Sequence, residues 1–253
     1  MAWRSSGATN ADLVENLCRH KMIDDARVKA AFLSVDRAHY TDYSPYVDAP
    51  QSIGYGVTIS APHMHAFAIQ HLMPYLVPDA AAGRPAPRVL DIGSGSGYLT
   101  HVFAELAGEH GRVLGVEHIP QLRDQAEQNM AKSAAGRQFL ASKRVAFVVG
   151  DGRLGAPRGA ADTAPFDAIH VGASAAELPQ ALLDQLRSPG RMFIPLDDTE
   201  AEYAPAFPGD PRDQHVWTID KAADGTVTRT KLFGVRYVPL TDAPGGATAM
   251  EAK

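Results

Sequence analysis

The sequence lacks several features that would place it in other classes of protein. It contains one cysteine, Cys18, among 253 residues, which excludes an internal disulfide and suits a reducing compartment. No apolar run reaches the ~18 residues of a membrane-spanning helix, and residues 1–10 do not resemble a signal peptide. No block of Lys and Arg stands out at a net charge of −5, which disfavours nucleic acid as a partner. We therefore expect a soluble, cytoplasmic protein with no membrane or nucleic-acid partner.

A glycine-rich stretch, Val89–Thr100, is the most informative part of the chain. It begins as a short apolar run that ends in Asp91, as a buried parallel strand does. Three glycines follow at alternate positions, and beyond them apolar residues recur at the spacing of one helix face: Leu99, Val102, Phe103 and Leu106. Strand, glycine turn and helix predict the first half of a βαβ unit, whose crevice at the carboxyl end of the strand binds ligands.

The spacing of Gly93, Gly95 and Gly97 distinguishes between several ligand-binding turns. A dinucleotide fingerprint needs its third glycine one residue later, at Tyr98, and the chain has no Gly-Lys-Ser/Thr as in a P-loop. A nucleophile elbow would need serine in place of Gly95. The pattern Asp-x-Gly-x-Gly-x-Gly resembles instead the first motif of class I methyltransferases, which bind S-adenosylmethionine. An ordinary tight turn between strand and helix is the alternative.

Two further predicted strands are followed by acids at the same edge of the sheet. Arg112–Glu117 ends about 20 residues past the glycines, where a carboxylate meets a ribose diol. Asp151 follows the strand Val145–Val149 and resembles the methyltransferase contact to the adenine amino group, with Gly152 leaving room for the ring. Alternatively, Glu117 is a solvated acid before the helix that Pro120 opens. Acids at the ends of three strands favour the cofactor site.

Several blocks beyond the glycine motif resemble the protein-L-isoaspartate O-methyltransferase family. The most specific block is Thr58-Ile-Ser-Ala-Pro-His-Met-His65, and the resemblance reaches from near the amino terminus to about Asp242 through Asp36–Tyr40, Pro50–Gly54, Gly150–Arg153, Phe166–Gly172, Pro189–Arg191 and Tyr237–Asp242. It implies an enzyme that uses S-adenosyl-L-methionine and releases S-adenosyl-L-homocysteine. The methyl acceptor implied is the free α-carboxylate of L-isoaspartyl residues in damaged proteins and peptides, whose repair the reaction initiates.

The resemblance also implies where the two ligands bind. The cofactor would contact Ile59, Ser60, Ala61, Pro62, His63, Asp91, Gly93, Ser94, Gly95, Gly97, Glu117, His118, Asp151, Gly152 and Thr241. The isoaspartyl segment would contact Gln51, Ser52, Ile53, Val57, Ser60, Val171 and Gly172. Ser60 is the expected catalytic residue, because its hydroxyl would orient the acceptor oxygen. A carboxylate is already ionised at pH 7, so no strong general base is needed.

The residues around Ser60 also have simpler explanations. Ser60 lies just before the helix that begins at Pro62, where a hydroxyl commonly caps free backbone N–H groups. The functional alternative is that Ser60 and the helix amino terminus bind an anionic group. His63 and His65 are two residues apart and point to different sides of a helix, which disfavours joint ligation of a metal. We therefore expect no metal site.

The pattern of elements predicts an α/β fold with a Rossmann-like, seven-stranded, mostly parallel sheet and helices on both faces. Residues 10–20, with Asn10 as the candidate cap, and the helix after Asp25 predict an added amino-terminal helical layer. Asp224-Gly225 predicts a hairpin, followed by strands at Thr226–Thr228 and Lys231–Val238. We expect a single, monomeric domain: residues 1–62 form the helical and substrate-slot layer, 63–242 the core, and 243–253 a flexible tail. The loop 201–212 is longer than the family leads us to expect.

Two rival functions remain at this point. The first is a methyltransferase that acts on a small molecule or on RNA, which the acidic balance and the block from Thr58 to His63 disfavour. The second is a cofactor-binding module that has lost catalysis and serves as an adaptor. Loss of Ser60 or Glu117 would have favoured the adaptor, and both residues are present.

Overall fold

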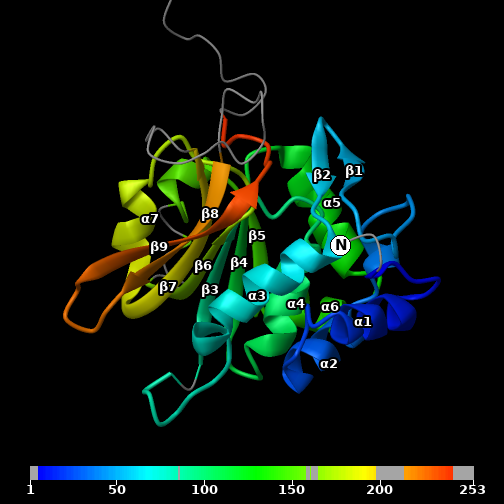
Figure 1. Ribbon diagram of the computed structural model, residues 1–253, viewed down its shortest axis with the longest axis horizontal. Coiled ribbons are helices and arrows are strands. Elements are labelled where there is room, and N and C mark those ends of the chain that lie inside the picture. Colours follow the sequence, from blue (N-terminus) through cyan, green and yellow to red (C-terminus); the bar gives the residue numbers. More distant parts are fainter. Residues whose placement is uncertain (1–4, 85, 158–159, 161–164, 198–213, 242–253) are drawn as a thin grey trace, which may run out of the picture.

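A seven-stranded sheet forms the centre of the computed structural model, which describes residues 5–84, 86–157, 160, 165–197 and 214–241. The strand order is β5-β4-β3-β6-β7-β8-β9 (Figure 1). The first five strands in that order are parallel: β5 (Val145–Val149), β4 (Arg112–Glu117), β3 (Arg88–Ile92), β6 (Phe166–Val171) and β7 (Leu186–Asp197). The antiparallel pairs β7–β8 and β8–β9 complete the sheet with β8 (Gln214–Lys221) and β9 (Val227–Val235). The predicted mixed sheet is confirmed.

Alternate residues of the central strands point into two separate cores, as the pleat requires. Val89, Val113 and Ala168 belong to one apolar cluster, which includes buried residues of the helices α3 (Pro62–Leu76), α4 (Tyr98–Leu106) and α5 (Pro120–Met130). Leu90, Leu114 and Ile169 belong to the other, which is completed by Leu182 of α7 (Gln180–Gln185). Both faces of the sheet are therefore covered by helices, as expected for parallel strands.

The amino-terminal layer consists of α1 (Asn10–Arg19), α2 (Ala26–Ser34) and the 3-10 turn η2 (Arg37–His39). A capping box begins α1: the Thr9 hydroxyl accepts from Asp12 N, and the Asp12 carboxylate accepts from Thr9 N. The cap is thus Thr9, one residue before the predicted Asn10. The layer packs on α4 through α2, so the segment that follows it lies close to the glycine loop.

A short antiparallel hairpin and α3 follow this layer. The hairpin consists of β1 (Gln51–Gly54) and β2 (Val57–Ile59), which pair only with each other within the described residues. Figure 1 shows the hairpin above the amino-terminal end of α3, at the edge of the molecule where the parallel strands end. The chain thus brings the block that begins at Thr58 to the carboxyl edge of the sheet.

Two elements differ from the sequence prediction. The predicted strands Thr226–Thr228 and Lys231–Val238 are replaced by one strand, β9, which ends at Val235 and pairs with β8 along its length, with one register shift between His215 and Trp217. The helix α6 (Ala134–Ala141) was not predicted; the Ser133 side chain caps it by accepting from Gly136 N. The predicted loop 201–212 and the tail 243–253 lie outside the described residues. None of the described helices is both long and apolar enough to cross a membrane.

Candidate active site

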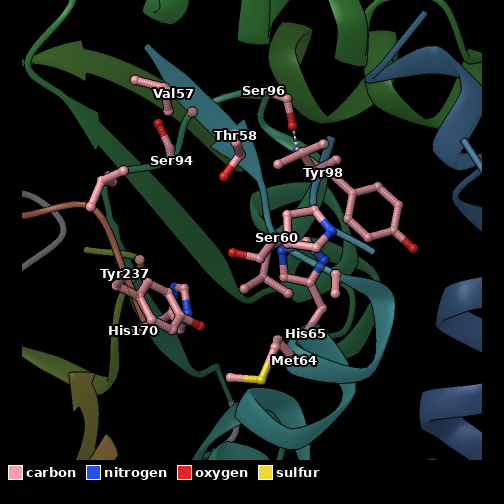
Figure 2. A pocket seen from close by; sticks show the side chains of 18 of the residues that line it. Val57, Thr58, Ser60, Met64, His65, Ser94, Ser96, Tyr98, His170 and Tyr237 are labelled. Carbon is pink, nitrogen blue, oxygen red and sulfur yellow. Dashed lines mark hydrogen bonds between the residues drawn. The ribbon is translucent and has the colours of Figure 1, made fainter. Parts of the chain in front are cut away.

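A cavity of about 150 Å³ lies at the carboxyl edge of the sheet. Four segments line it: β2 with the start of α3, the glycine loop, the end of β6, and the residues that follow β9 (Figure 2). Parallel strands place their carboxyl ends at one edge, and this edge is where open α/β sheets bind ligands. The topology therefore assembles segments that lie far apart in the sequence.

Asp91 forms the floor of the cavity on the sheet side. Its side chain is buried, and its two oxygens accept hydrogen bonds from Thr100 Oγ1 at 2.5 Å and from His170 Nδ1 at 2.8 Å. His170 also stacks on Phe193, with ring centroids 6.0 Å apart. With Nδ1–H bonded to a carboxylate, the ring orientation is fixed and Nε2 is the nitrogen left for other partners. His170 lines the cavity, so this pair presents a fixed polar group to a ligand.

Glu117 fixes the glycine loop from the end of β4. Its carboxylate is buried and accepts from three backbone amides: Gly95 N at 2.9 Å, His118 N at 2.8 Å and Ile119 N at 3.0 Å. His118 Nδ1 lies 3.0 Å from Oε1 of the same carboxylate. Glu117 is thus not a solvated acid, and it holds the loop after β3 against the end of β4.

The glycine loop needs glycine for two different reasons. Gly97 has a φ of +83°, and a Cβ there would lie 3.0 Å from the Ala126 Cβ and 3.1 Å from the Phe147 ring, so packing of α5 and β5 excludes a side chain. Gly95 has a φ of +52°, and its added Cβ would lie 3.3 Å from Ile53 Cδ1 of β1. The bare backbone at Gly95 therefore leaves room beneath the hairpin.

Ser60 lines the cavity, and it does not cap α3. The N-cap position is Ala61, and no side chain of that residue bonds the helix. Asp48 takes this role from a distance, since its Oδ1 accepts from His63 N at 3.0 Å and from His63 Nδ1 at 2.8 Å. Tyr237 lines the same cavity, and burial raises the pKa of its hydroxyl to about 12, while an interaction with the Ser60 side chain lowers it.

His65 is a further buried residue in the wall of the cavity, beside Tyr98. The ring centroids of the two side chains are 5.2 Å apart. Burial, followed by the nearby Arg37 charge, lowers the pKa of His65 well below its usual value. The ring is therefore neutral at pH 7.

The structure brings together half of the predicted cofactor residues. Ile59, Ser60, Ala61, Asp91, Gly93, Ser94 and Gly95 line the cavity. Glu117 and His118 adjoin it through the contacts of the glycine loop. Asp151 bonds Arg153, and a Cβ on Gly152 would meet Ile92 Cγ2 at 2.4 Å. Neither residue lines the cavity, and their contacts to the cofactor stay a prediction. Pro62, His63, Gly97 and the exposed Thr241 do not line the cavity.

The predicted substrate residues divide between two cavities. Val57, Ser60 and Gly172 line the cavity described above. Ser52 and Ile53 line a second cavity of about 340 Å³, between the hairpin and the carboxyl-terminal end of α5. Gln51 and the fully buried Val171 line neither.

Sequence reasoning missed several lining residues and two residues behind the wall. His65, Tyr98, His170 and Tyr237 line the cavity, and each lies in a block that carried the family resemblance. Asp48 and Arg37 contact the wall from behind. Arg37 falls in the block Asp36–Tyr40, so a charged residue in an apolar layer was the available signal. His63 faces Asp48 and His65 faces Arg37, and no group of three metal-ligating side chains occurs within the described ranges.

This sheet order, with a glycine loop and acids at its carboxyl edge, defines a class I methyltransferase. The model of the family "Protein-L-isoaspartate(D-aspartate) O-methyltransferase (PCMT)" matches residues 8–245 of the chain. The chain belongs to this family.

Individual relatives agree with that assignment. The chain is 42% identical to a protein-L-isoaspartate O-methyltransferase of Caenorhabditis elegans, over 95% of this chain and 96% of the relative. It is 46% identical to protein-L-isoaspartate O-methyltransferase 1 of Arabidopsis thaliana, over 94% and 93% of the two chains. A Plasmodium falciparum structure described as a protein-L-isoaspartate O-methyltransferase, in complex with S-adenosyl-L-homocysteine, superposes with a TM-score of 0.77 at 33% sequence identity. The superposition covers 93% of this chain and 99% of the Plasmodium chain.

Gly95→Val is expected to abolish binding of S-adenosyl-L-homocysteine while the chain stays folded. A β-branched side chain would occupy the space below Ile53 at a φ that such residues avoid. Titration calorimetry measures the loss. Gly225→Val is the matched control, because Gly225 has a φ of +85° in the β8–β9 turn and open space around it. Unchanged affinity in Gly95→Val would remove the glycine loop from the cofactor site.

Glu117→Ala is expected to weaken both the cofactor-free protein and its cofactor complex. Three amides lose their acceptor, and each buried donor left unpaired costs roughly 1–3 kcal/mol, so we expect a loss of at least about 3 kcal/mol in the free energy of unfolding. Urea denaturation tests this, and calorimetry should show a cofactor affinity lower by about 10–100-fold. Glu127→Ala removes a partly exposed carboxylate and should change stability by less than about 0.5 kcal/mol. Equal stability of the two variants would contradict the structural role of Glu117.

Proposed function

We propose that this protein transfers a methyl group from S-adenosyl-L-methionine to the free α-carboxylate of L-isoaspartyl residues in proteins and peptides. The products are the methyl ester and S-adenosyl-L-homocysteine, and ester formation initiates repair of the damaged site. The family match and the relatives support the activity. The observation that carries the assignment of the site is that Ser60 lines the cavity while Asp48 caps the helix in its place.

The residues of the cavity fit the proposed cofactor. Gly93 and Gly95 present bare backbone to the cavity, and a Cβ on Gly95 would press against the hairpin. Glu117 Oε2 accepts only from Gly95 N, whereas Oε1 is engaged by His118 and Ile119, so Oε2 keeps one acceptor position for a ligand. Ile59, Ser60, Ala61, Asp91 and Ser94 would hold the remainder, as the sequence implied. When bound, S-adenosyl-L-methionine supplies an electrophilic methyl group on a sulfonium.

The protein's own contribution to the reaction is positioning. The acceptor carboxylate needs no base at pH 7, and bringing two bound groups together in line accounts for roughly 7–11 kcal/mol of a barrier. The Ser60 hydroxyl donates to one acceptor oxygen, while Tyr237, neutral at pH 7, restrains that hydroxyl. Gly172 and Val57 shape the slot in which the peptide backbone lies. The remaining predicted contacts, Gln51, Ser52, Ile53 and Val171, stay part of this proposal.

The proposal includes the oligomeric state and the cellular compartment of the enzyme. A single domain that acts as a monomer fits a cavity whose four lining segments come from one chain. The cytoplasm fits a chain with one cysteine, since disulfides are rare there. Light scattering on the purified protein measures its oligomeric state directly.

Ser60→Ala should lower kcat by about 10-fold or more and change the affinity for S-adenosyl-L-homocysteine by less than about 3-fold, because the lost hydrogen bond orients the acceptor. Steady-state kinetics with a synthetic isoaspartyl peptide and calorimetry measure the two effects. Ser133→Ala is the control, because it removes the cap of α6 and should lower only stability. If Ser60→Ala lowers stability but not kcat, as is expected of Ser133→Ala, Ser60 has no role in turnover.

The enzyme should methylate an L-isoaspartyl peptide and leave the same peptide with L-aspartate essentially untouched. In isoaspartate the chain continues through the side-chain carbonyl, so the free carboxylate lies one carbon from the backbone nitrogen. In aspartate it lies one methylene further away, and a misplacement of ~1 Å costs on the order of 100-fold. Transfer of labelled methyl at saturating cofactor compares the isomers. Equal labelling would indicate a general carboxyl methyltransferase, and no labelling of either would favour an adaptor.

A further inference from the structure

Arg37 is the largest fully buried side chain of the described protein that carries a charge. Its exposed fraction is 0%, and within the described residues no carboxylate forms an ion pair with it. Burial lowers the pKa of Arg37 only to about 10, so the guanidinium is cationic at pH 7. A buried cation without an anionic partner is costly and needs a reason.

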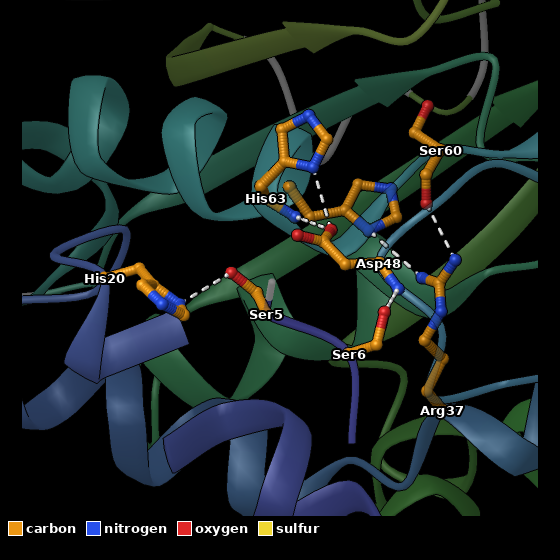
Figure 3. Close-up of polar contacts among 8 residues, drawn as sticks. Ser5, Ser6, His20, Arg37, Asp48, Ser60 and His63 are labelled. Atoms are coloured by element: carbon orange, nitrogen blue, oxygen red, sulfur yellow. Dashed lines mark hydrogen bonds and ion pairs between the residues drawn. The ribbon is translucent and has the colours of Figure 1, made fainter. Parts of the chain in front are cut away.

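The neighbouring acid does not supply the missing partner. Asp48 Oδ1 is occupied by His63, and its Oδ2 has no hydrogen-bond partner among the described residues (Figure 3). Asp48 raises the pKa of Arg37 through its charge and not through a hydrogen bond. Arg37 Nε likewise has no partner there. The two buried charges lie in one cluster without bonding each other.

Among the described residues, the hydrogen-bond and ring contacts of the guanidinium are with the wall of the active-site cavity. Nη2 donates to the carbonyl oxygen of Ser60 at 2.7 Å, and Nη1 lies 3.4 Å from His65 Nδ1. The guanidinium carbon lies 5.2 Å from the centroid of the Tyr98 ring. Ser60, His65 and Tyr98 each line the cavity, whereas Arg37 does not. Arg37 thus lies directly behind three lining residues, with one layer of side chains between its charge and a ligand.

Other buried or half-buried arginines of the protein are arranged differently. Arg191 bonds Asp220 at 2.6 Å, and Arg187 lies 3.3 Å from Asp167. Arg144 donates to the carbonyl oxygens of Ala104 and Gly108 and lies over the Phe139 ring, far from the cavity lining. Arg37 alone among these four combines a fully buried charge with contacts to the active-site wall.

We propose that Arg37 is a positioning residue whose charge is balanced by a carboxylate bound in the cavity. Through its bond to the Ser60 carbonyl it fixes the turn that enters α3, and its positive potential favours an anionic ligand group at Ser60. This inference rests on the proposed function, which brings two such carboxylates to the site. One belongs to the amino-acid end of the cofactor, and the other is the methyl acceptor.

Arg37→Gln separates the charge from the hydrogen bond, because glutamine keeps an N–H donor for the Ser60 carbonyl. Calorimetry compares S-adenosyl-L-homocysteine with 5′-methylthioadenosine, which lacks the amino-acid carboxylate. If the cofactor carboxylate balances Arg37, the first ligand weakens by on the order of tenfold and the second does not. If the acceptor carboxylate does so, both affinities stay and the KM for the isoaspartyl peptide rises by on the order of tenfold. Either result supports the proposal.

Two outcomes overturn it. Arg37→Gln could leave both affinities and KM unchanged, or it could weaken both nucleoside ligands equally, as general damage to the fold would. Arg37→Lys keeps the charge and should therefore keep the wild-type ratio of the affinities for S-adenosyl-L-homocysteine and 5′-methylthioadenosine. A change in this ratio is a further outcome that overturns the proposal. The lysine variant provides the test if Arg37→Gln does not fold. Arg144→Met is the control for loss of a guanidinium bonded to carbonyls. The binding measurements need no turnover, so an inactive wild-type protein would contradict only the proposed function.

Discussion

The hydrogen bonds between the Glu117 carboxylate and three backbone amides are the interaction on which the site depends. They tie the loop after β3 to the end of β4, so two parallel strands and the turn between them present one continuous edge. Such an arrangement is possible only when both strands end at the same level of the sheet, which the register of β3 with β4 provides. The buried carboxylate is satisfied by donors that water cannot replace, so the loop keeps its shape without a ligand.

The amino-terminal layer completes the site from the other side. The hairpin β1–β2 lies against the glycine loop, where a Cβ added to Gly95 would lie 3.3 Å from Ile53 Cδ1, and the first turn of α3 lines the same cavity. Asp48 caps α3 and thereby releases Ser60 from the capping role that its position suggests. The layer is therefore part of the active site and not only a packing element. Arg37 of η2 and Asp48, neither of which lines the cavity, hold the turn that carries the expected catalytic hydroxyl.

The sequence allowed prediction of what depends on local pattern. Strand-ending acids, the alternate glycines and the apolar face of α4 each follow from a few consecutive residues, and the mostly parallel, seven-stranded sheet is confirmed. Contacts between distant segments could not be predicted. Thr100 and His170 both bond Asp91, yet they lie on α4 and β6, and no spacing rule links them. Arg37 and Asp48 were missed for the same reason. Helix α3 buries Ile69, Leu72 and Leu76, because it packs on both β6 and α4.

The charges around the cavity are divided in a way that suits the proposed chemistry. The buried acids Asp91 and Glu117 belong to the sheet edge. On the side of β2 and α3 lie the buried cation Arg37 and the acid Asp48, whose Oδ1 is bonded by His63. A methyl donor of this class carries a positive sulfonium, and the acceptor is a carboxylate. Fixed charges of opposite sign on two sides of the cavity would orient both ligands before any bond changes, at no cost of reorganisation during the reaction. Because the acceptor is already ionised, fixed charges that position it are enough and the proposed reaction needs no base. The neutral side chains of His65 and Tyr237 in the same wall are consistent with this, since neither has to take up a proton.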